Sequence, residues 1–506
     1  MDQNSYSYTE SYGPERPLTK TLSRLRALGF VLGAITCFLS LFMLPPWLLL
    51  IFEGDSDRGA FALSFILALG SGLTMLGLGY GARMHLRARH LFLLTVLSWL
   101  VLSFFGALPF MFSRLHLSLT DAIFETVSGI TTTGSTVLSN LPTLSHGMLL
   151  WRGLLQWMGG IGIIVMAMAI LPFLRVGGMK LFQTESSDRS DNHLPNARAL
   201  AASIGKVYGS ITLLCLLTFW IGGMRFFDAL VHALATVSTG GFGNYDDSFA
   251  HFTQPFLAWA GSFFMLLSAL PLALYGRIFK RTNKPIWQDD QVKGLLRFLL
   301  FVIVILAVWL KLQPAYAYMS WEEAFRYTTF NVISVVTTTG FAYTDYTQWG
   351  AFAVLTFFFL TFMGGCSGST SGGIKMFRFQ LCTRALMGQL HQLLHPRAIR
   401  EQRYNGRTVS DEVLRAIIAF AFFYCLTVAL IGLALTTMGL DVLTSLSGAA
   451  TAVSNVGPGI GDIIGPAGNF ASLPDGAKWL LAFGMLMGRL EILTVLVLLI
   501  PNAWRW

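Results

Sequence analysis

FETVSGITTTGST, from Phe124 to Thr136, places a short amphipathic segment directly before a run of threonine and glycine. Three later stretches have the same layout: VHALATVSTGGFG (Val231 to Gly243), FNVISVVTTTGFA (Phe330 to Ala342) and SGAATAVSNVGPG (Ser447 to Gly459). When the four copies are aligned on Gly134, Gly241, Gly340 and Gly457, these glycines are 107, 99 and 117 residues apart. A recurrence near 100 residues indicates an internal repeat.

The sequence between the repeated stretches is that of an integral membrane protein. Hydrophobic residues make up 54% of the 506 residues, charged residues only 12%, and the mean hydropathy is +0.61. A span needs about 20 apolar residues. Ten candidate spans follow, at 27–52, 60–80, 91–112, 149–174, 200–223, 254–276, 294–313, 350–363 with a continuation after a break, 414–438 and 478–500.

The basic residues orient these spans. The formal charge is +9, but the bases cluster in loops between apolar runs rather than on a soluble domain, which argues against nucleic-acid binding. With a cytoplasmic N-terminus, 27 of the 35 lysines and arginines fall on the inner side. Both termini are then cytoplasmic, and each repeated stretch lies in an outer connection. We see no cleavable signal peptide, and the five cysteines suggest neither disulfides nor a zinc site.

A threonine- and glycine-rich stretch that dips into the bilayer is tolerated where it is buried or lines an aqueous cavity. Glycine permits positive φ, so carbonyl oxygens can point towards one axis, and hydroxyls add further oxygen ligands. Four such stretches can form a ring of oxygens that replaces the hydration shell of an alkali ion. A single TTTG could equally be a helix-packing site, but four copies in register favour the ring. Acidic residues are expected to cap the preceding short helices, at Asp121, Asp228, Glu322, Glu323 and Asp441.

Two further features lie within the spans. GGCSGSTSGGIK, from Gly364 to Lys375, interrupts a span with small residues and is either a packing kink or a flexible loop. It lacks the Gly-Lys-Ser/Thr of a phosphate-binding loop. Arg489 lies midway along the last span, which makes it a functional candidate because a central charge is costly there. Glu491 has no assigned role, and Glu125 and His232 are expected to make structural hydrogen bonds.

These stretches, together with QWMGGIGIIVMAMAILP (Gln156 to Pro172) and GRLEILTVLVLL (Gly488 to Leu499), resemble the Trk/Ktr/HKT superfamily of potassium transporters, in particular its TrkH membrane subunits. The resemblance covers nearly the whole chain. It implies an all-α polytopic protein with four pseudo-symmetric helix–pore loop–helix repeats around a central pore, preceded by two extra transmembrane helices. The expected division is 1–26 cytoplasmic segment, 27–82 extra helices, 83–198 repeat 1, 199–285 repeat 2, 286–407 repeat 3 with a gating loop, and 408–506 repeat 4.

The resemblance also implies which residues handle the ion. Potassium would be coordinated by the backbone of four filter segments: Thr132, Thr133 and Gly134; Thr239, Gly240 and Gly241; Thr338, Thr339 and Gly340; Asn455, Val456 and Gly457. In the second segment either Gly240 or Gly241 could face the ion. The gate would be formed by Gly364, Gly365, Gly368, Gly372, Gly373, Lys375 and Arg489.

Potassium is then the transported ion, preferred over sodium, and no organic cofactor is expected in this chain. The resemblance implies a homodimer in the bacterial inner membrane, surrounded by membrane lipid, with a separate cytoplasmic nucleotide-binding regulatory subunit of the TrkA type. The basic loop from Arg397 to Arg415 is a plausible docking surface for it. A symporter tightly coupled to protons or sodium is the alternative. A membrane-bound enzyme is disfavoured because the sequence has no ATPase, protease or metal-site pattern.

Overall fold

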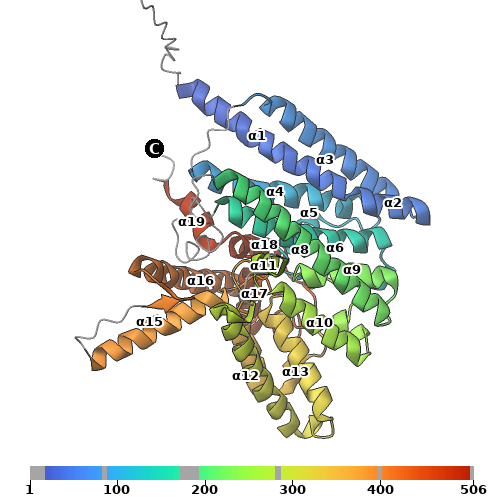
Figure 1. The fold of residues 1–506 in the computed structure, drawn as a ribbon. Coiled ribbons are helices and arrows are strands. Elements are labelled where there is room, and N and C mark those ends of the chain that lie inside the picture. The colour runs from blue at the N-terminus through green and yellow to red at the C-terminus, as the bar shows by residue number, and fades with distance from the viewer. Residues whose placement is uncertain (1–16, 83–87, 171–192, 280–285, 396–401, 502–506) are drawn as a thin grey trace, which may run out of the picture.

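The structure is a computed structural model that describes residues 17–82, 88–170, 193–279, 286–395 and 402–501. The regular secondary structure in these ranges is helical, apart from a minimal antiparallel hairpin in which β1 (Arg403–Tyr404) pairs with β2 (Arg407–Thr408). Irregular loops connect the helices. Figure 1 shows the helices gathered into one body, with α15 and α16 projecting from it. The expected all-α polytopic fold is confirmed. Residues 1–16 and several of the loop bases used to orient the chain lie outside the described residues.

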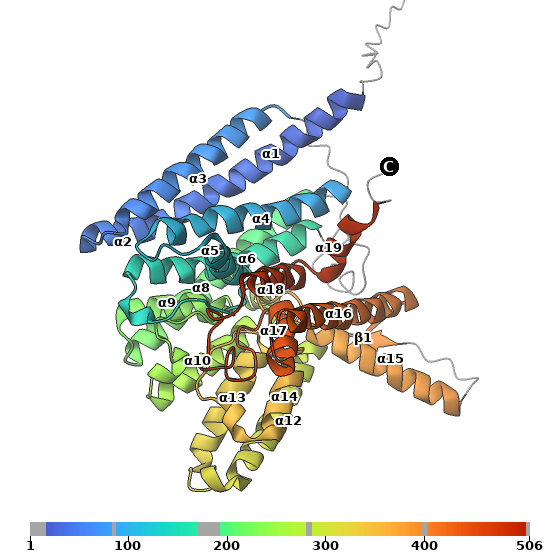
Figure 2. The ribbon, with the colours of Figure 1, turned by 180° about the vertical axis from the view of Figure 1, so that it is seen from behind.

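Three helices precede the repeats: α1 (Pro17–Phe42), α2 (Leu44–Glu53) and α3 (Arg58–Gly79). The pair α1 and α3 lies along one edge of the molecule, outside the remaining helices (Figure 2). The two helices approach closely at Gly33 and Gly72, where a Cβ added to Gly72 would lie 2.6 Å from the sulfur of Cys37. Small residues at such crossings let helix backbones pack closely in lipid.

Each repeat contains a long helix, a short helix and a third helix that is broken in repeats 2 to 4. Repeat 1 has α4 (Ala88–Phe112), α5 (Leu119–Ile130) and α6 (His146–Ile170). Repeat 2 has α8 (His193–Ile221), α9 (Phe226–Val237), α10 (Pro255–Ser268) and α11 (Leu272–Phe279). Repeat 3 has α12 (Asp290–Leu312), α13 (Trp321–Val336), α14 (Ala351–Leu360) and α15 (Met376–Leu394). Repeat 4 has α16 (Asp411–Thr437), α17 (Val442–Ser454), α18 (Asp475–Arg489) and α19 (Ile492–Leu499).

Single 3₁₀ turns connect some of these helices: η1 (Leu141–Thr143), η2 (Ser248–His251), η3 (Ile286–Gln288), η4 (Pro314–Tyr316) and η5 (Tyr346–Trp349). The apolar core falls into two large clusters. One is drawn mainly from α1–α6 and α16–α19, and the other from α8–α14. Repeats 1 and 4 thus share one half of the core, and repeats 2 and 3 share the other half.

The four short helices, α5, α9, α13 and α17, begin in different ways. Asp441 is the N-cap of α17 and accepts from the backbone N–H of Thr444. Hydrogen bonds from Thr444 hold the pKa of Asp441 below its usual value. Serines cap α5 and α13, where Asp121 and Glu323 lie in the first turn instead. The expectation that Asp228 caps α9 is wrong, because Arg225 takes the cap position.

Within the described residues, six of the ten expected spans coincide with helical segments that are long and apolar enough to cross a membrane. The first of these segments consists of α1 and α2 together. Two of the expected spans are broken in the structure. The span at 478–500 contains α18 and α19, which meet at 110°. The span at 254–276 contains α10 and α11, with a break before Leu272. Hydropathy reports how apolar a segment is and carries no information on its direction. The span expected at 149–174 corresponds to α6, and its last four residues lie outside the described residues.

Candidate ion-binding site

The four repeated stretches adopt the same unusual backbone conformation. After each short helix, one residue takes the left-handed conformation, with φ between 54° and 57°, and the glycine two residues later has φ between 78° and 111°. The first set is Thr132, Thr239, Thr338 and Asn455, and the second is Gly134, Gly241, Gly340 and Gly457. A left-handed threonine is an outlier that costs about 1–3 kcal/mol and persists only where its surroundings impose it. The second repeat is thereby aligned on Gly241, with Gly240 at the position of Thr133.

The four stretches meet in a closed ring. A Cβ added to any of the four glycines would lie 2.7 Å or less from a backbone carbonyl oxygen of the next repeat. The pairs are Gly134 with Gly240, Gly241 with Thr339, Gly340 with Val456, and Gly457 with Thr133. Contacts therefore run from repeat 1 to 2, 3 and 4 and back to 1. The structure brings all twelve residues expected in the filter to this ring, and each of the four glycines is required there by close approach as well as by φ.

Side-chain hydrogen bonds close the ring between repeats 4 and 1. Asn455 Nδ2 donates to Thr133 Oγ1 at 2.9 Å, and the Ser135 hydroxyl donates to the carbonyl oxygen of Gly457 at 2.8 Å. Repeat 4 has asparagine where the other repeats have threonine. This difference has a structural role, because the longer Asn455 side chain carries the N–H donor across to Thr133. The threonines of the ring are fully buried.

Gln156, which the sequence analysis placed only within a family stretch, contacts the ring directly. Its Nε2 donates to the carbonyl oxygen of Gly240 at 2.6 Å, and its Oε1 accepts from the backbone N–H of Phe242 at 3.1 Å. A carbonyl oxygen has two lone pairs. One lone pair of the Gly240 oxygen is therefore engaged by protein, so this oxygen is a weaker ion ligand than a free one.

The segment from Gly364 to Lys375 is an irregular loop between α14 and α15, which contacts three of the four filter segments. The Thr370 hydroxyl is 3.3 Å from that of Thr239, and the Ser371 hydroxyl is 3.2 Å from that of Thr338. The Gly372 N–H donates to the Thr338 hydroxyl at 2.6 Å. A Cβ on Gly372 would also lie 2.5 Å from the carbonyl oxygen of Ser454 in repeat 4.

The other glycines of the loop have different environments. A Cβ on Gly364 would meet the carbonyl oxygen of Gly372, and one on Gly365 would lie 2.9 Å from that of Ala269. Gly368 and Gly373 have φ of 79° and 64°. The loop is therefore an ordered structure against the filter, and the hydroxyls of Thr370 and Ser371, which sequence reasoning missed, make its contacts with filter threonines.

The buried side chain of Arg489 makes hydrogen bonds with this loop and with α6. Its Nη1 donates to the carbonyl oxygen of Thr370 at 2.9 Å, and its Nη2 donates to that of Gly159 at 3.2 Å. The side chain is 3% exposed, and its Nε has no partner among the described residues. Arg489 thus joins the loop of repeat 3 to α6 of repeat 1.

Two more basic side chains lie at or just after the C-terminal end of the loop and make contacts there. Lys375 Nζ donates to the carbonyl oxygen of Ser371. Arg378, in the first turn of α15, pairs with Glu491 at 2.7 Å. Glu491 has φ of 62° and lies at the 110° bend between α18 and α19. The acid whose role the sequence left open therefore holds the bend of repeat 4 to the base of the loop.

Carboxylate and imidazole chemistry is not gathered at this ring. Within the described ranges, no group of three or more His, Cys, Asp or Glu side chains is placed to hold a metal ion. The donor set of the ring consists of carbonyl and hydroxyl oxygens, which are hard, neutral ligands suited to a weakly bound monovalent cation.

An all-α polytopic membrane protein with four re-entrant segments in one ring is the class that this fold and site define. The chain is 51% identical to the Trk system potassium uptake protein TrkI of Halomonas elongata over 491 residues, which cover 97% of this chain and 99% of that protein. It is 36% identical to TrkH of Escherichia coli K12 over 486 residues, with 95% and 99% covered. The crystal structure of the potassium transporter TrkH from Vibrio parahaemolyticus matches with a TM-score of 0.87 at 33% identity, covering 95% of this chain and 99% of that one. Residues 65–505 match the family described as TrkH, cation transport protein, and the chain belongs to that family.

Proposed function

We propose that this chain carries potassium ions across the bacterial inner membrane, through the ring formed by the four filter segments. The closed cycle of glycine–carbonyl contacts through repeats 1, 2, 3 and 4 is the observation that carries the proposal. It supports a single pore lined by backbone oxygens, which can replace the water around a potassium ion. Relatives that match 95% or more of this chain are named potassium uptake proteins, which supports the choice of ion.

The loop from Gly364 to Lys375, together with Arg489, is the proposed gate. The loop contacts three filter segments, and the buried side chain of Arg489 links it to α6. A cation fixed under the filter opposes the passage of potassium by charge repulsion. Release of the Arg489 hydrogen bonds would let the small-residue loop move.

The remaining proposals concern the assembly. The distribution of basic residues supports cytoplasmic termini. A separate nucleotide-binding regulatory subunit of the TrkA type would dock on the cytoplasmic side, and the chain would act as a homodimer in the membrane. Relatives are named as parts of a Trk system, which supports a partner.

Uptake of potassium and rubidium by a bacterial strain that lacks its other potassium uptake systems tests the proposed function. Gly340→Ser should reduce this uptake at least about tenfold, because the new Cβ meets the Val456 carbonyl oxygen and forces two filters apart. Gly439→Ala is the matched control: its φ of 88° is similar, but no atom lies within 4 Å of the added Cβ. Equal membrane abundance is checked by immunoblot. Normal uptake by Gly340→Ser would contradict the proposed pore.

A reversal potential that follows potassium alone would exclude tight coupling to protons or sodium.

A further inference from the structure

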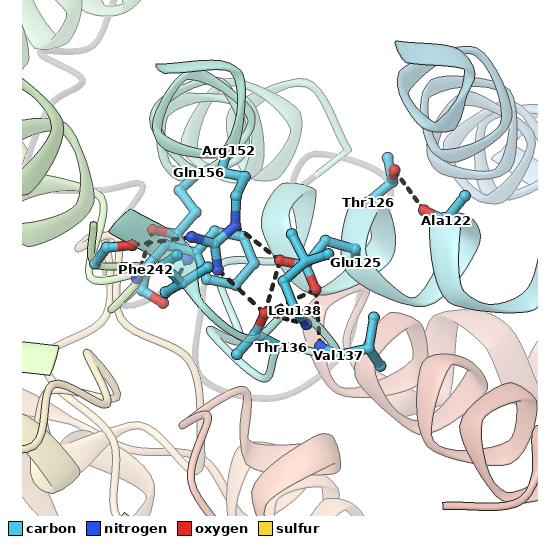
Figure 3. A network of polar contacts seen from close by, with 12 residues as sticks. Ala122, Glu125, Thr126, Thr136, Val137, Leu138, Arg152, Gln156 and Phe242 are labelled. Atoms are coloured by element: carbon cyan, nitrogen blue, oxygen red, sulfur yellow. Dashed lines mark hydrogen bonds and ion pairs between the residues drawn. The ribbon is translucent and has the colours of Figure 1, made fainter. Parts of the chain in front are cut away.

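A buried ion pair lies beside the first filter segment, on residues that the ring itself does not contain. Arg152 Nε donates to Glu125 Oε1 at 2.8 Å, and the two side chains are 1% and 0% exposed. Glu125 also accepts from the Thr136 hydroxyl and from the backbone N–H of Val137, each at 3.0 Å (Figure 3). The Glu125 carboxylate on α5 is therefore hydrogen-bonded to the segment just after the first filter glycine, Gly134.

In two other repeats a side chain of the short helix also accepts a hydrogen bond from the backbone that follows the filter glycine, but the accepting group differs. In repeat 3, Asn331 Oδ1 accepts from the N–H of Tyr343 at 3.3 Å, and in repeat 4, Ser447 Oγ accepts from the N–H of Ile460 at 2.9 Å. Val137, Tyr343 and Ile460 are each the third residue after their filter glycine. An amide and a hydroxyl suffice in those repeats, so this hydrogen bond itself does not require a charge.

Arg152 explains why repeat 1 uses a carboxylate. Its Nη1 donates to the carbonyl oxygen of Gly243 at 2.9 Å, and its Nη2 donates to the Thr136 hydroxyl at 3.2 Å. The guanidinium also lies 4.2 Å from the ring centroid of Phe242 (Figure 3). Gly243 follows the second filter, so one planar guanidinium joins the segments that leave filters 1 and 2.

Stability alone does not account for such a pair. Well-packed apolar side chains can replace a buried ion pair at no loss of stability, whereas removal of one partner leaves a costly unpaired charge. What the guanidinium adds is geometry, because its donors point in fixed directions in one plane. The Arg152 contacts therefore fix how far apart the ends of filters 1 and 2 lie.

We propose that Glu125 and Arg152 form a brace that sets the spacing of filters 1 and 2 and thereby the preference for potassium over sodium. Both are positioning residues, which act through Thr136, Val137 and Gly243 on the neighbouring ring oxygens. The proposal rests on the proposed function, since it assumes that the ring selects the ion. A looser ring closes more readily around the smaller sodium ion, so loss of the brace lowers discrimination rather than transport itself.

The test measures the potassium-to-sodium permeability ratio of purified protein in liposomes, scaled to equal reconstituted protein. Arg152→Gln should lower this ratio about tenfold, which corresponds to about 1.4 kcal/mol of differential stabilisation between the two ions. The double variant Glu125→Gln with Arg152→Gln leaves no unpaired charge and should fold where the single variant fails, with the same loss of discrimination.

Two further variants separate positioning from folding. Arg152→Lys keeps the charge opposite Glu125 but cannot also reach Gly243 and Thr136, so it should restore abundance and not the ratio. The control is Arg114→Gln with Asp55→Asn, away from the ring, and should keep the wild-type ratio. Arg114 pairs with Asp55 at 3.0 Å and also with the buried Asp57 at 3.5 Å, so this control too removes a cation from a buried carboxylate.

A wild-type ratio in the well-folded double variant would overturn the brace. A drop in abundance with an unchanged ratio in every Arg152 variant would show that the pair is structural only, which also overturns it. Failure of the proposed function is distinguishable, because the wild-type protein itself would then carry no potassium.

Discussion

At the scale of single residues, the site depends on backbone oxygens that are not equivalent. The carbonyl oxygen of Gly240 accepts a hydrogen bond from Gln156, and that of Gly457 accepts one from Ser135. Each such bond engages one lone pair of the carbonyl oxygen. The ring is therefore symmetric in backbone shape but unequal in the hydrogen bonding of its oxygens.

Gln156→Leu should weaken both the second filter and the folded state. Leucine has a similar size but leaves the backbone N–H of Phe242 without its acceptor, which costs about 1–3 kcal/mol when the group is buried. We expect a lower melting temperature of the purified protein in detergent and reduced rubidium uptake. Gln156→Glu keeps the acceptor but sets a carboxylate oxygen against the Gly240 carbonyl oxygen and buries an unpaired charge, so it should lower the melting temperature further. A melting temperature unchanged in both variants would contradict this account.

Residue-level prediction succeeded where a local conformation demanded a residue type. The glycines of the filters follow from positive φ and close approach, and the sequence showed them as a repeated pattern. Gln156 and Thr370 could not be found in this way, because their partners lie 84 and 131 residues away in the chain. No spacing in the sequence shows that α6 of repeat 1 faces the second filter.

At the scale of elements, the loop from Gly364 to Lys375 is ordered by hydrogen bonds with the filter threonine hydroxyls and with the guanidinium of Arg489. Thr370 is held through its side chain to Thr239 and through its carbonyl oxygen to Arg489. The segment that the sequence left as either a packing kink or a flexible loop is thus an ordered loop, whose glycines allow both its turns and its close contact with Ser454. Repeats 2 and 4 thus both hold this loop of repeat 3 in place.

Arg489→Gln should raise potassium flux in the absence of any regulatory partner. The shorter neutral side chain cannot bridge Thr370 and Gly159, and it removes a positive charge from beneath the filter. Arg489→Lys keeps the charge but, with a single nitrogen, bridges the two carbonyl oxygens poorly, so the size of its effect separates charge from tethering. The measurement is single-channel or liposome flux at equal protein. Arg415→Gln, on an exposed position of α16, is the control, and an unaltered basal flux in Arg489→Gln would count against the gate.

The element pattern was partly predictable. The apolar runs gave most helices, and the break in repeat 3 followed from its small residues. The 110° bend between α18 and α19 was not predictable, because Glu491, which has φ of 62° at the bend, pairs there with Arg378, 113 residues earlier in the chain. A hydropathy pattern is the same for a straight and a bent apolar segment.

At the scale of the whole molecule, α1 and α3 contribute to one half of the core and supply no residue to the ring. Stability and ion preference should therefore respond separately to changes in this hairpin. Gly72→Val should lower the melting temperature, because even its Cβ would lie 2.6 Å from the Cys37 sulfur and 3.0 Å from backbone atoms.

The potassium-to-sodium preference of the surviving Gly72→Val protein should equal that of the wild type. Gly70→Val, two residues earlier in α3 with nothing within 4 Å of its added Cβ, is the matched control and should leave both properties unchanged. A shift in ion preference in Gly72→Val would show that the hairpin shapes the pore.

Because one polypeptide supplies all four segments of the ring, a substitution in any segment is present once per ring. In a channel assembled from four identical chains, the same substitution enters four times, and mixed assemblies of normal and altered chains arise. In this chain each segment can be altered by itself, so the ring combines an asparagine in repeat 4 with threonines at the corresponding positions of the other three repeats.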